Sequence, residues 1–231
     1  MREVESVLEP VLEAVSLEGK NVIDVGCGTG DVARALSGHG ARVLAVDRPE
    51  MLVKARRGEG TPGVSFVEGG AERLPAENDS ADVVLFLASF HHVPAVQMKP
   101  SLSEAYRVLR PGGSALFIEP LVECSYYLIT RLVEDETEAR LRAHSAIVNA
   151  DAAGFLRDVE DFFYVERSFE DYRDLLDVHW EESEELKRDT LSRAEVIARK
   201  LAAGAGCELD DYRFQSACRL NQLRKPENEL R

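Results

Sequence analysis

The stretch Val22-Ile23-Asp24-Val25-Gly26-Cys27-Gly28-Thr29-Gly30-Asp31 decides the fold of this chain. An apolar run ends in an acid, three glycines follow at alternate positions, and Val32-Ala33-Arg34-Ala35-Leu36 continues with the character of a helix. This order predicts a strand, a tight turn and a helix start. Glycines let a backbone approach a ligand closely, and the free N–H groups of a helix start offer it hydrogen bonds. We therefore expect a nucleotide or nucleoside site at the carboxyl end of a parallel sheet.

The spacing of the glycines argues against a dinucleotide. The dinucleotide fingerprint reads G-x-G-x-x-G, and Asp31 occupies the position of its third glycine. A pyrophosphate would also meet Asp24 and Asp31, two acids that repel an anion. No Gly-Lys-Ser/Thr follows the turn, so a Walker loop is excluded. The ligand is therefore expected to be neutral or cationic near this turn.

A second acid ends the next expected strand. Residues 42–46 are mainly apolar and lead into Asp47, which lies about 20 residues beyond the turn. An acid at this place is positioned to accept hydrogen bonds from two ribose hydroxyls. A single aspartate at a strand end is often only a turn residue or a helix cap, but its order behind the glycine turn favours a ribose.

Strand-like and helix-like segments alternate along the first half of the chain. This alternation predicts an α/β fold with a doubly wound, mostly parallel sheet and helices on both faces. Seven strands are expected, the last of them antiparallel to the others: 21–25, 42–46, 64–67, 82–88, 114–118, 162–169 and 211–220. Helices are expected over 3–16, 31–38, 49–57, 96–109, 170–179 and 184–203, and residues 121–150 have helical character.

Three further segments follow the turn and Asp47 in a fixed order: Gly69-Gly70-Ala71-Glu72-Arg73-Leu74-Pro75, then the run from Asp82 to Val93, then Val108-Leu109-Arg110-Pro111-Gly112-Gly113. The five together resemble the class I S-adenosylmethionine-dependent methyltransferases of the broad small-molecule, methyltransferase-11-like group. The resemblance implies a Rossmann-like sheet, S-adenosylmethionine as the cofactor and S-adenosylhomocysteine as its product. It also implies methyl transfer to a small-molecule acceptor by direct in-line displacement.

The resemblance assigns roles around the cofactor. Asp24 lies below the turn in reach of the methionine ammonium, Asp47 takes the ribose, and Arg48 lies on the adenine face. Ala71 and Glu72 flank the adenine edge. The full set of expected cofactor-binding residues is Asp24, Gly26, Cys27, Gly28, Gly30, Asp47, Arg48, Ala71, Glu72 and Leu87, the last through backbone groups near the methionine.

One position departs from the family pattern. Family members usually carry an aspartate, which bonds the adenine amino group, where this chain has Gly70. The contact is left either to backbone groups near Ala71 or to Glu72.

Candidates for catalysis and for the acceptor pocket come from aromatic side chains. His91 and His92 follow the strand expected at 82–88 and lie near the expected methyl position, where a histidine is suited to act as a general base. The alternative is a structural pair with one ring hydrogen-bonded in the fold. Tyr126 and Tyr127 either line the acceptor pocket or pack in the core.

Charge and cysteine usage narrow the range of partners. The formal net charge of −14 argues against nucleic acid, because phosphate binding needs a basic face. Neither a signal peptide nor a run of transmembrane length is recognised. The cysteines at 27, 124, 207 and 218 show no C-x-x-C spacing, so we expect free thiols, no metal site and a cytoplasmic protein.

The chain of 231 residues is expected to form a single methyltransferase domain, 1–231. Its parts are an N-terminal helix within 1–19, a cofactor-binding core over 20–120, and a helical insertion over 121–160 that would cover the substrate. Strands 6 and 7 with their helices fill 161–231. Alternatives to small-molecule methyl transfer are an enzyme of altered chemistry that uses the same cofactor, a protein methyltransferase, and a non-catalytic cofactor-binding module. The oligomeric state is left open, with a homodimer among the options.

Overall fold

The computed structural model describes residues 1–56, 60–131, 134–169, 193, 196 and 212–227. The chain divides into two compact units. The larger unit holds Val7–Glu119, Leu141–Asp161 and Arg219–Arg231, and the smaller unit holds Met1–Ser6, Pro120–Arg140 and Phe162–Cys218. Apart from 193 and 196, the helices expected over 170–179 and 184–203 lie outside the described residues.

A parallel sheet forms the centre of the larger unit. Its hydrogen-bonded neighbours follow the order β6–β5–β2–β3–β4, and each of these pairs is parallel. The strands are β2 (Asn21–Val25), β3 (Arg42–Asp47), β4 (Val64–Glu68), β5 (Ala81–Leu87) and β6 (Leu109–Pro120). β2 and β5 are mainly apolar and most of their residues are buried, which is typical of parallel strands covered on both faces.

The order of these strands creates a switch point. The chain passes outward from β2 to β3 and β4, and then returns to place β5 on the other side of β2. Loops that leave the carboxyl ends of β2 and β5 therefore diverge, and open α/β sheets bind ligands in the crevice that results. The glycine turn lies at this point.

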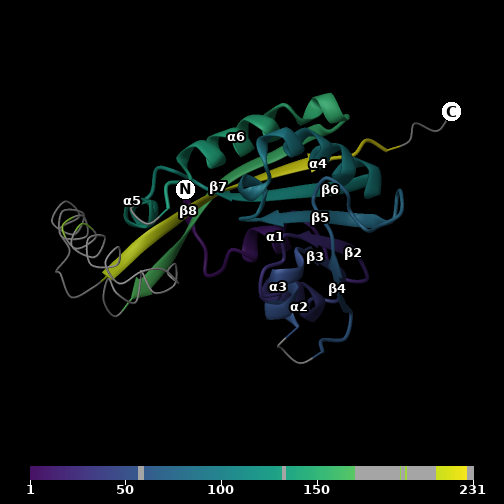
Figure 1. The fold of residues 1–231 in the computed structure, drawn as a ribbon, viewed down its shortest axis with the longest axis horizontal. Helices are drawn as coiled ribbons and strands as arrows, with labels where there is room; N and C mark the ends of the chain where they lie inside the picture. Colours follow the sequence, from purple (N-terminus) through teal and green to yellow (C-terminus); the bar gives the residue numbers. More distant parts are fainter. Residues whose placement is uncertain (57–59, 132–133, 170–192, 194–195, 197–211, 228–231) are drawn as a thin grey trace. The chain divides into compact units, whose positions relative to one another are not determined.

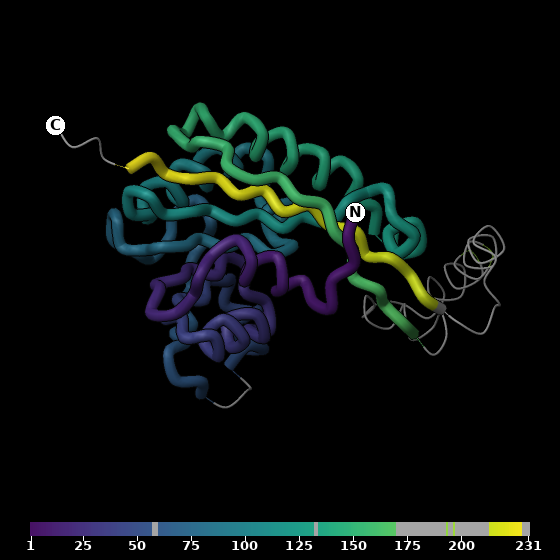
Figure 2. Tube along the Cα trace, turned by 180° about the vertical axis from the view of Figure 1, so that it is seen from behind, coloured from purple at the N-terminus to yellow at the C-terminus, as the bar shows by residue number. Residues whose placement is uncertain are grey.

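Two long strands, β7 (Leu156–Phe169) and β8 (Tyr212–Arg224), contribute residues to both units. In the larger unit β8 runs antiparallel to β6, because Lys225 exchanges backbone hydrogen bonds with Gly112 and Gly113 while Gln222 bonds Ser114 further along β6. Figure 2 shows the yellow β8 beside the teal β6. The antiparallel last strand expected from the sequence is confirmed.

Helices cover both faces of the sheet in the larger unit. Figure 1 shows α2 (Asp31–Gly38) and α3 (Pro49–Ala55) together beside β3 and β4. A separate hydrophobic cluster joins β2 and β5 to α4 (Ala95–Val108), to the part of α6 (Thr137–Val148) that belongs to this unit, and to the 3₁₀ helix η2 (Ala150–Ala153). None of the described helices combines the length and apolar character needed to cross a membrane.

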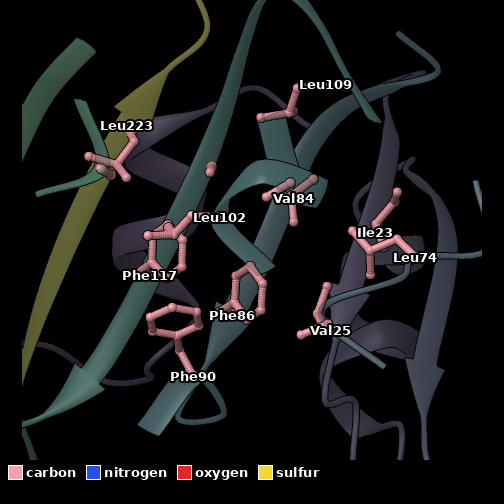
Figure 3. Close-up of a cluster of buried hydrophobic side chains, with 14 of the residues drawn as sticks. Ile23, Val25, Leu74, Val84, Phe86, Phe90, Leu102, Leu109, Phe117 and Leu223 are labelled. Atoms are coloured by element: carbon pink, nitrogen blue, oxygen red, sulfur yellow. The ribbon is translucent and has the colours of Figure 1, made fainter. Parts of the chain in front are cut away.

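Three phenylalanines pack together within this cluster (Figure 3). Phe86 of β5 stacks on Phe117 of β6 with ring centroids 4.8 Å apart. Phe90 of the 3₁₀ helix η1 (Phe90–His92) meets both rings edge-on at 5.2 and 5.0 Å. All three side chains are buried, so this packing fixes the backbone that carries His91 and His92.

The smaller unit adds an eighth strand to the seven expected. β1 (Arg2–Glu3) pairs in parallel with Phe163 and Tyr164 of β7. Two residues are too short for an alternating pattern to be recognised. The short helix α5 (Ser125–Thr130) also lies in this unit.

Three of the expected boundaries differ most from the structure. The N-terminal helix α1 spans only Glu9–Ala14, not 3–16, because a proline in a helix interior clashes with the preceding turn and Pro10 fits only at its start. The strand expected at 162–169 begins at Leu156, inside the expected insertion. Its start was missed because the first residues are exposed, several of them are charged, and they lack an apolar pattern. β6 begins at Leu109 rather than at 114, through a register shift opposite Ala81 and Val83.

Candidate functional site

The glycine turn links β2 to α2 through three left-handed residues. Gly26, Gly28 and Gly30 have φ of +76°, +57° and +82°, values that other residues adopt only with strain. The turn is held by the backbone N–H groups of Gly26 and Cys27, which both donate to the carbonyl of Val46 at 2.8 and 3.3 Å. The end of β3 therefore positions the turn directly.

Asp47 strengthens the same connection with its side chain. The Gly28 N–H donates to Oδ2 of Asp47 at 2.7 Å, and the Arg48 N–H donates to Oδ1 at 2.7 Å. Both carboxylate oxygens are thus oriented by backbone groups, and each keeps further capacity to accept a hydrogen bond. A rigid, half-buried carboxylate of this kind suits a pair of neighbouring hydroxyls.

Asp24 is a buried acid below the turn. Its side chain is 2% exposed, and its Oδ2 has no hydrogen-bond partner among the described residues. Burial, and then the negative charge of Asp47, raise the pKa of Asp24 to about 7. A buried carboxyl with an unused oxygen is stabilised by a cationic or donor group, so this site fits the ammonium or sulfonium of S-adenosylmethionine.

Cys27 lies within the turn, and its thiol is unreactive. Burial raises the pKa of its thiol to about 12, and the negative charges of Asp24 and Asp47 add to the rise. The thiol is therefore neutral at physiological pH and contributes shape rather than charge or nucleophilicity.

Two residues that the sequence analysis did not assign to the site, Arg34 and Ser89, bond the turn or the segments next to it. Arg34 donates to the carbonyls of Thr29 and Ala55, at 2.9 and 2.5 Å, and its guanidinium lies 5.4 Å from the centre of the Phe66 ring. Ser89, just after β5, donates to the carbonyl of Val25 at 2.6 Å. Both lie in segments that the sequence analysis singled out, but it gave neither residue a role.

The loop after β4 lies next to the carboxyl end of β3. The Gly69 N–H donates to the Asp47 carbonyl at 3.2 Å, and Ala71 is buried while Glu72 is half-buried. Arg48, expected on the adenine face, is exposed. Leu87 ends β5, and the next residue, Ala88, has a φ of +50°. The structure therefore brings the expected cofactor residues to one edge of one sheet.

The two histidines differ in their surroundings. His91 is buried, with Nδ1 2.5 Å from Oε2 of Glu119, whose other carboxylate oxygen accepts the Phe90 N–H at 2.9 Å. His92 is exposed, with its ring centre 4.1 Å from that of His91. The surroundings of His91 thus favour a structural role, in which its ring is hydrogen-bonded within the fold.

Tyr126 and Tyr127 belong to the smaller unit. Tyr127 is 1% exposed, its hydroxyl lies 3.2 Å from Asp135 and 3.0 Å from Thr137, and the Arg140 guanidinium lies 4.0 Å from its ring centre. Tyr126 is half-buried and stacks in parallel on Phe169 at 6.0 Å. Their part in an acceptor pocket remains a prediction.

Comparison with known proteins agrees with this geometry. Residues 23–117 match the family model of a methyltransferase domain. The chain is 40% identical over 108 residues to phthiotriol/phenolphthiotriol dimycocerosates methyltransferase 1 of Mycobacterium ulcerans, covering 46% of this chain and 39% of that protein. It is 39% identical over 111 residues to demethylmenaquinone methyltransferase of Chlorobaculum tepidum, covering 46% of this chain and 44% of that protein. The matched region thus spans less than half the length of either relative.

The fold agreement extends over nearly the whole chain. A protein of Bacillus halodurans C-125, provisionally assigned as a methyltransferase, superposes with a TM-score of 0.68 at 24% identity, over 95% of this chain and 99% of that one. At that identity the likeness concerns the fold. Residues 23–117 thus resemble a methyltransferase domain, and the chain shares the fold of that solved structure over nearly its whole length.

Proposed function

We propose that this protein transfers a methyl group from S-adenosylmethionine to a small-molecule acceptor by in-line displacement. The observation that carries the proposal is the pairing of two acids at one turn. Asp24 offers a positive charge a buried oxygen that has no partner among the described residues, and Asp47 offers two fixed oxygens to a ribose diol. A cationic nucleoside satisfies both, whereas the phosphates of an anionic nucleotide would be repelled by the acid at Asp24.

When bound, S-adenosylmethionine supplies a methyl group that is already activated by a positively charged sulfur. The residues of the chain therefore need to align an acceptor and keep water away, which accounts for most of the expected rate gain. We assign the alignment of the acceptor to the carboxyl ends of β2 and β5. The hydrogen bond from the Ser89 hydroxyl to the Val25 carbonyl holds these two strand ends together. The packing of Phe90 fixes the adjoining 3₁₀ turn.

A base is required when the acceptor atom carries a proton. We assign this role to His92 rather than to His91. The Nδ1 of His91 is committed to Glu119 in a buried pair, whereas His92 is exposed on the same turn.

The class of acceptor is suggested by the relatives. Their names denote a phthiotriol or phenolphthiotriol dimycocerosate and a demethylmenaquinone. We propose a small molecule of comparable kind, with a hydroxyl, phenol or activated ring carbon as the acceptor atom. The strongly negative net charge of −14 favours an acceptor that is neutral or cationic.

Two measurements test the proposed function. Calorimetric titration of the purified protein with S-adenosylhomocysteine should show binding, and an Asp47→Ala variant should lose most of it. Incubation with deuteromethyl-labelled cofactor and a panel of demethylquinols, phenols and long-chain alcohols should give an acceptor heavier by one labelled methyl group. Absence of S-adenosylhomocysteine binding in the folded wild type would rule the proposal out. Cofactor turnover without any methylated product would point instead to an altered chemistry.

A further inference from the structure

A groove of about 700 Å³ lies between α4 and α6 in the larger unit. Its α4 side runs from Ala95 to Ser103, which is about 12 Å at a rise of about 1.5 Å per residue. Its other side is formed by residues of α6 and η2 between Arg142 and Ala153. The volume falls within the range of about 300–1,000 Å³ that is ordinary for small-molecule sites. None of the lining residues is assigned above to the cofactor or to methyl transfer.

Small side chains keep this groove open above the hydrophobic core. Its most buried lining residues are Met98 and Leu102, which are 4% and 3% exposed and belong to the hydrophobic cluster of the unit. Around them the lining contains the alanines at positions 95, 146, 152 and 153. Longer side chains at these positions would fill the space between the two helices. An apolar ligand in the groove would therefore lie directly on the core cluster.

The charge of the groove is opposite to that of the whole chain. Lys99 of α4 and Arg142 of α6 line its two sides, and no aspartate or glutamate is among its lining residues, although the net charge of the chain is −14. Lys99 is exposed and makes no hydrogen bond or ion pair with another described residue. Two cations beside an apolar surface are complementary to a ligand that has an apolar part and a negative charge.

We propose that the groove between α4 and α6 binds a long-chain carboxylate, with its head group at Lys99 and Arg142 and its alkyl chain on Met98 and Leu102. Burial of each CH₂ group raises affinity by about 2- to 4-fold, because part of the chain stays open to solvent. An ion pair at an exposed cation adds at most about 5-fold. Chain length should therefore govern affinity, and the two cations should select the charged head group.

The methionines of the chain can report where the ligand binds. Met98 lines the groove, whereas the methyl carbon of Met51 lies 4.0 Å from a Cβ on Gly28 in the glycine turn. NMR of protein labelled at the methionine methyl groups is followed during titration with octanoate, decanoate and dodecanoate. The Met98 signal should shift and saturate with one equivalent, and the affinity should rise by about 2- to 4-fold for each CH₂ group. The Met51 signal should not move.

Charge variants test the head group. Lys99→Gln combined with Arg142→Gln should weaken decanoate binding by about 3- to 30-fold and leave decanol binding within about 2-fold of wild type. Lys54→Gln changes an exposed lysine on α3 and is the matched control, which should bind decanoate like the wild type. Equal affinities of the wild type for decanoate and decanol would overturn the proposed carboxylate.

Filling variants test the location. Ala146→Leu should abolish the shift of Met98 with either ligand, because the larger side chain occupies the groove. Ala152→Leu, at an exposed lining position, serves the same purpose if Ala146→Leu lowers the melting temperature. Decanoate binding that both folded variants leave unchanged would overturn the proposal, as would a wild-type Met98 signal that no carboxylate moves. Sedimentation velocity examines a second copy of the chain as the occupant. A wild-type dimer that Ala152→Leu converts to a monomer, without decanoate binding to either, would assign the groove to a subunit interface instead.

Discussion

The imidazole of His91 and the carboxylate of Glu119 lie 2.5 Å apart, and both side chains are buried. His91 belongs to the 3₁₀ turn η1 after β5, and Glu119 lies near the end of the neighbouring strand β6. The second oxygen of Glu119 accepts the Phe90 N–H, so a single carboxylate holds both the turn and the ring. The pair connects the carboxyl ends of two strands at the edge where the residues that we propose for cofactor binding lie.

Removing this carboxylate should destabilise the fold. We expect Glu119→Ala to lower the free energy of unfolding by about 3 kcal/mol or more, because it leaves a buried ring and a buried N–H without their acceptor. Glu119→Gln keeps an acceptor for the Phe90 N–H and should cost less. Urea denaturation followed by circular dichroism measures both. A loss below about 0.5 kcal/mol in Glu119→Ala would mean that the pair does not hold η1.

The exposed neighbour of the pair should behave differently. We expect His92→Ala to reduce kcat by about 10²- to 10⁴-fold on an acceptor that must lose a proton, which is the usual contribution of a general base. Its affinity for S-adenosylhomocysteine and its melting temperature should stay close to wild type. Turnover that is unaffected in His92→Ala would remove this residue from the reaction.

The three glycines of the turn should not be equally sensitive to substitution. A Cβ on Gly26 would lie 2.6 Å from the Cβ of Ser89, whereas the nearest atom to a Cβ on Gly28 is the methyl carbon of Met51 at 4.0 Å. Gly26→Ala should therefore cost about 2–5 kcal/mol and Gly28→Ala about 1–2 kcal/mol, the latter from its positive φ alone. The melting temperatures of the two variants show which substitution destabilises the protein more. Equal losses would contradict the packing of Ser89 on the turn.

Asp47 should control affinity more than stability. Asp47→Asn removes a charged acceptor from the ribose, and we expect binding of S-adenosylhomocysteine to weaken by about 10- to 100-fold. Asp31→Asn is the matched control, since Asp31 is an exposed acid on the same turn. Calorimetric titration of both variants with S-adenosylhomocysteine measures the two affinities. If they are equal, Asp47 does not bind the ribose.

The sequence predicted the site best where local geometry alone determines it. Glycines at alternate positions after a buried strand require a tight left-handed turn, and Asp47 follows at the end of the next parallel strand, so their contact could be expected. The pairing of His91 with Glu119 could not, because it depends on the register between β5 and β6.

The ends of strands and helices were predicted less well where their residues are largely exposed. β7 begins with exposed, charged residues, and its ion pair between Asp158 and Arg224 of β8, at 3.6 Å, joins positions far apart in the sequence. A period-2 apolar pattern is absent from such a strand. At the N-terminus, the apolar spacing of 3–16 suggested a longer helix than Pro10 allows.

The buried acid Asp24 should make the stability of the ligand-free protein depend on pH. Burial and the charge of Asp47 raise its pKa from 3.8 to about 7, so the folded protein keeps a proton that the unfolded chain releases. The contribution of this group to the free energy of unfolding therefore falls as the pH rises from about 4 to about 7. A rise of about three in pKa corresponds to about 4 kcal/mol.

Asp24→Asn isolates this contribution, because an asparagine stays neutral throughout. The stability of the variant relative to the wild type should increase by up to about 4 kcal/mol between pH 4 and pH 8, while other acids titrate in both proteins and cancel. Urea unfolding at each pH gives the difference. A pH-independent difference would mean that Asp24 is ionised in the free protein, with a partner that supports its charge.

The same proton should appear in cofactor binding. A ligand ammonium or sulfonium near Asp24 favours the ionised carboxylate, so binding should lower its pKa and release a proton when the pH is just below 7. Affinity for S-adenosylmethionine should accordingly rise with pH up to about 7 in the wild type. Titrations in buffers of different ionisation enthalpy measure the released proton directly. Asp24→Asn should release none, and equal release from both proteins would assign the proton to another group.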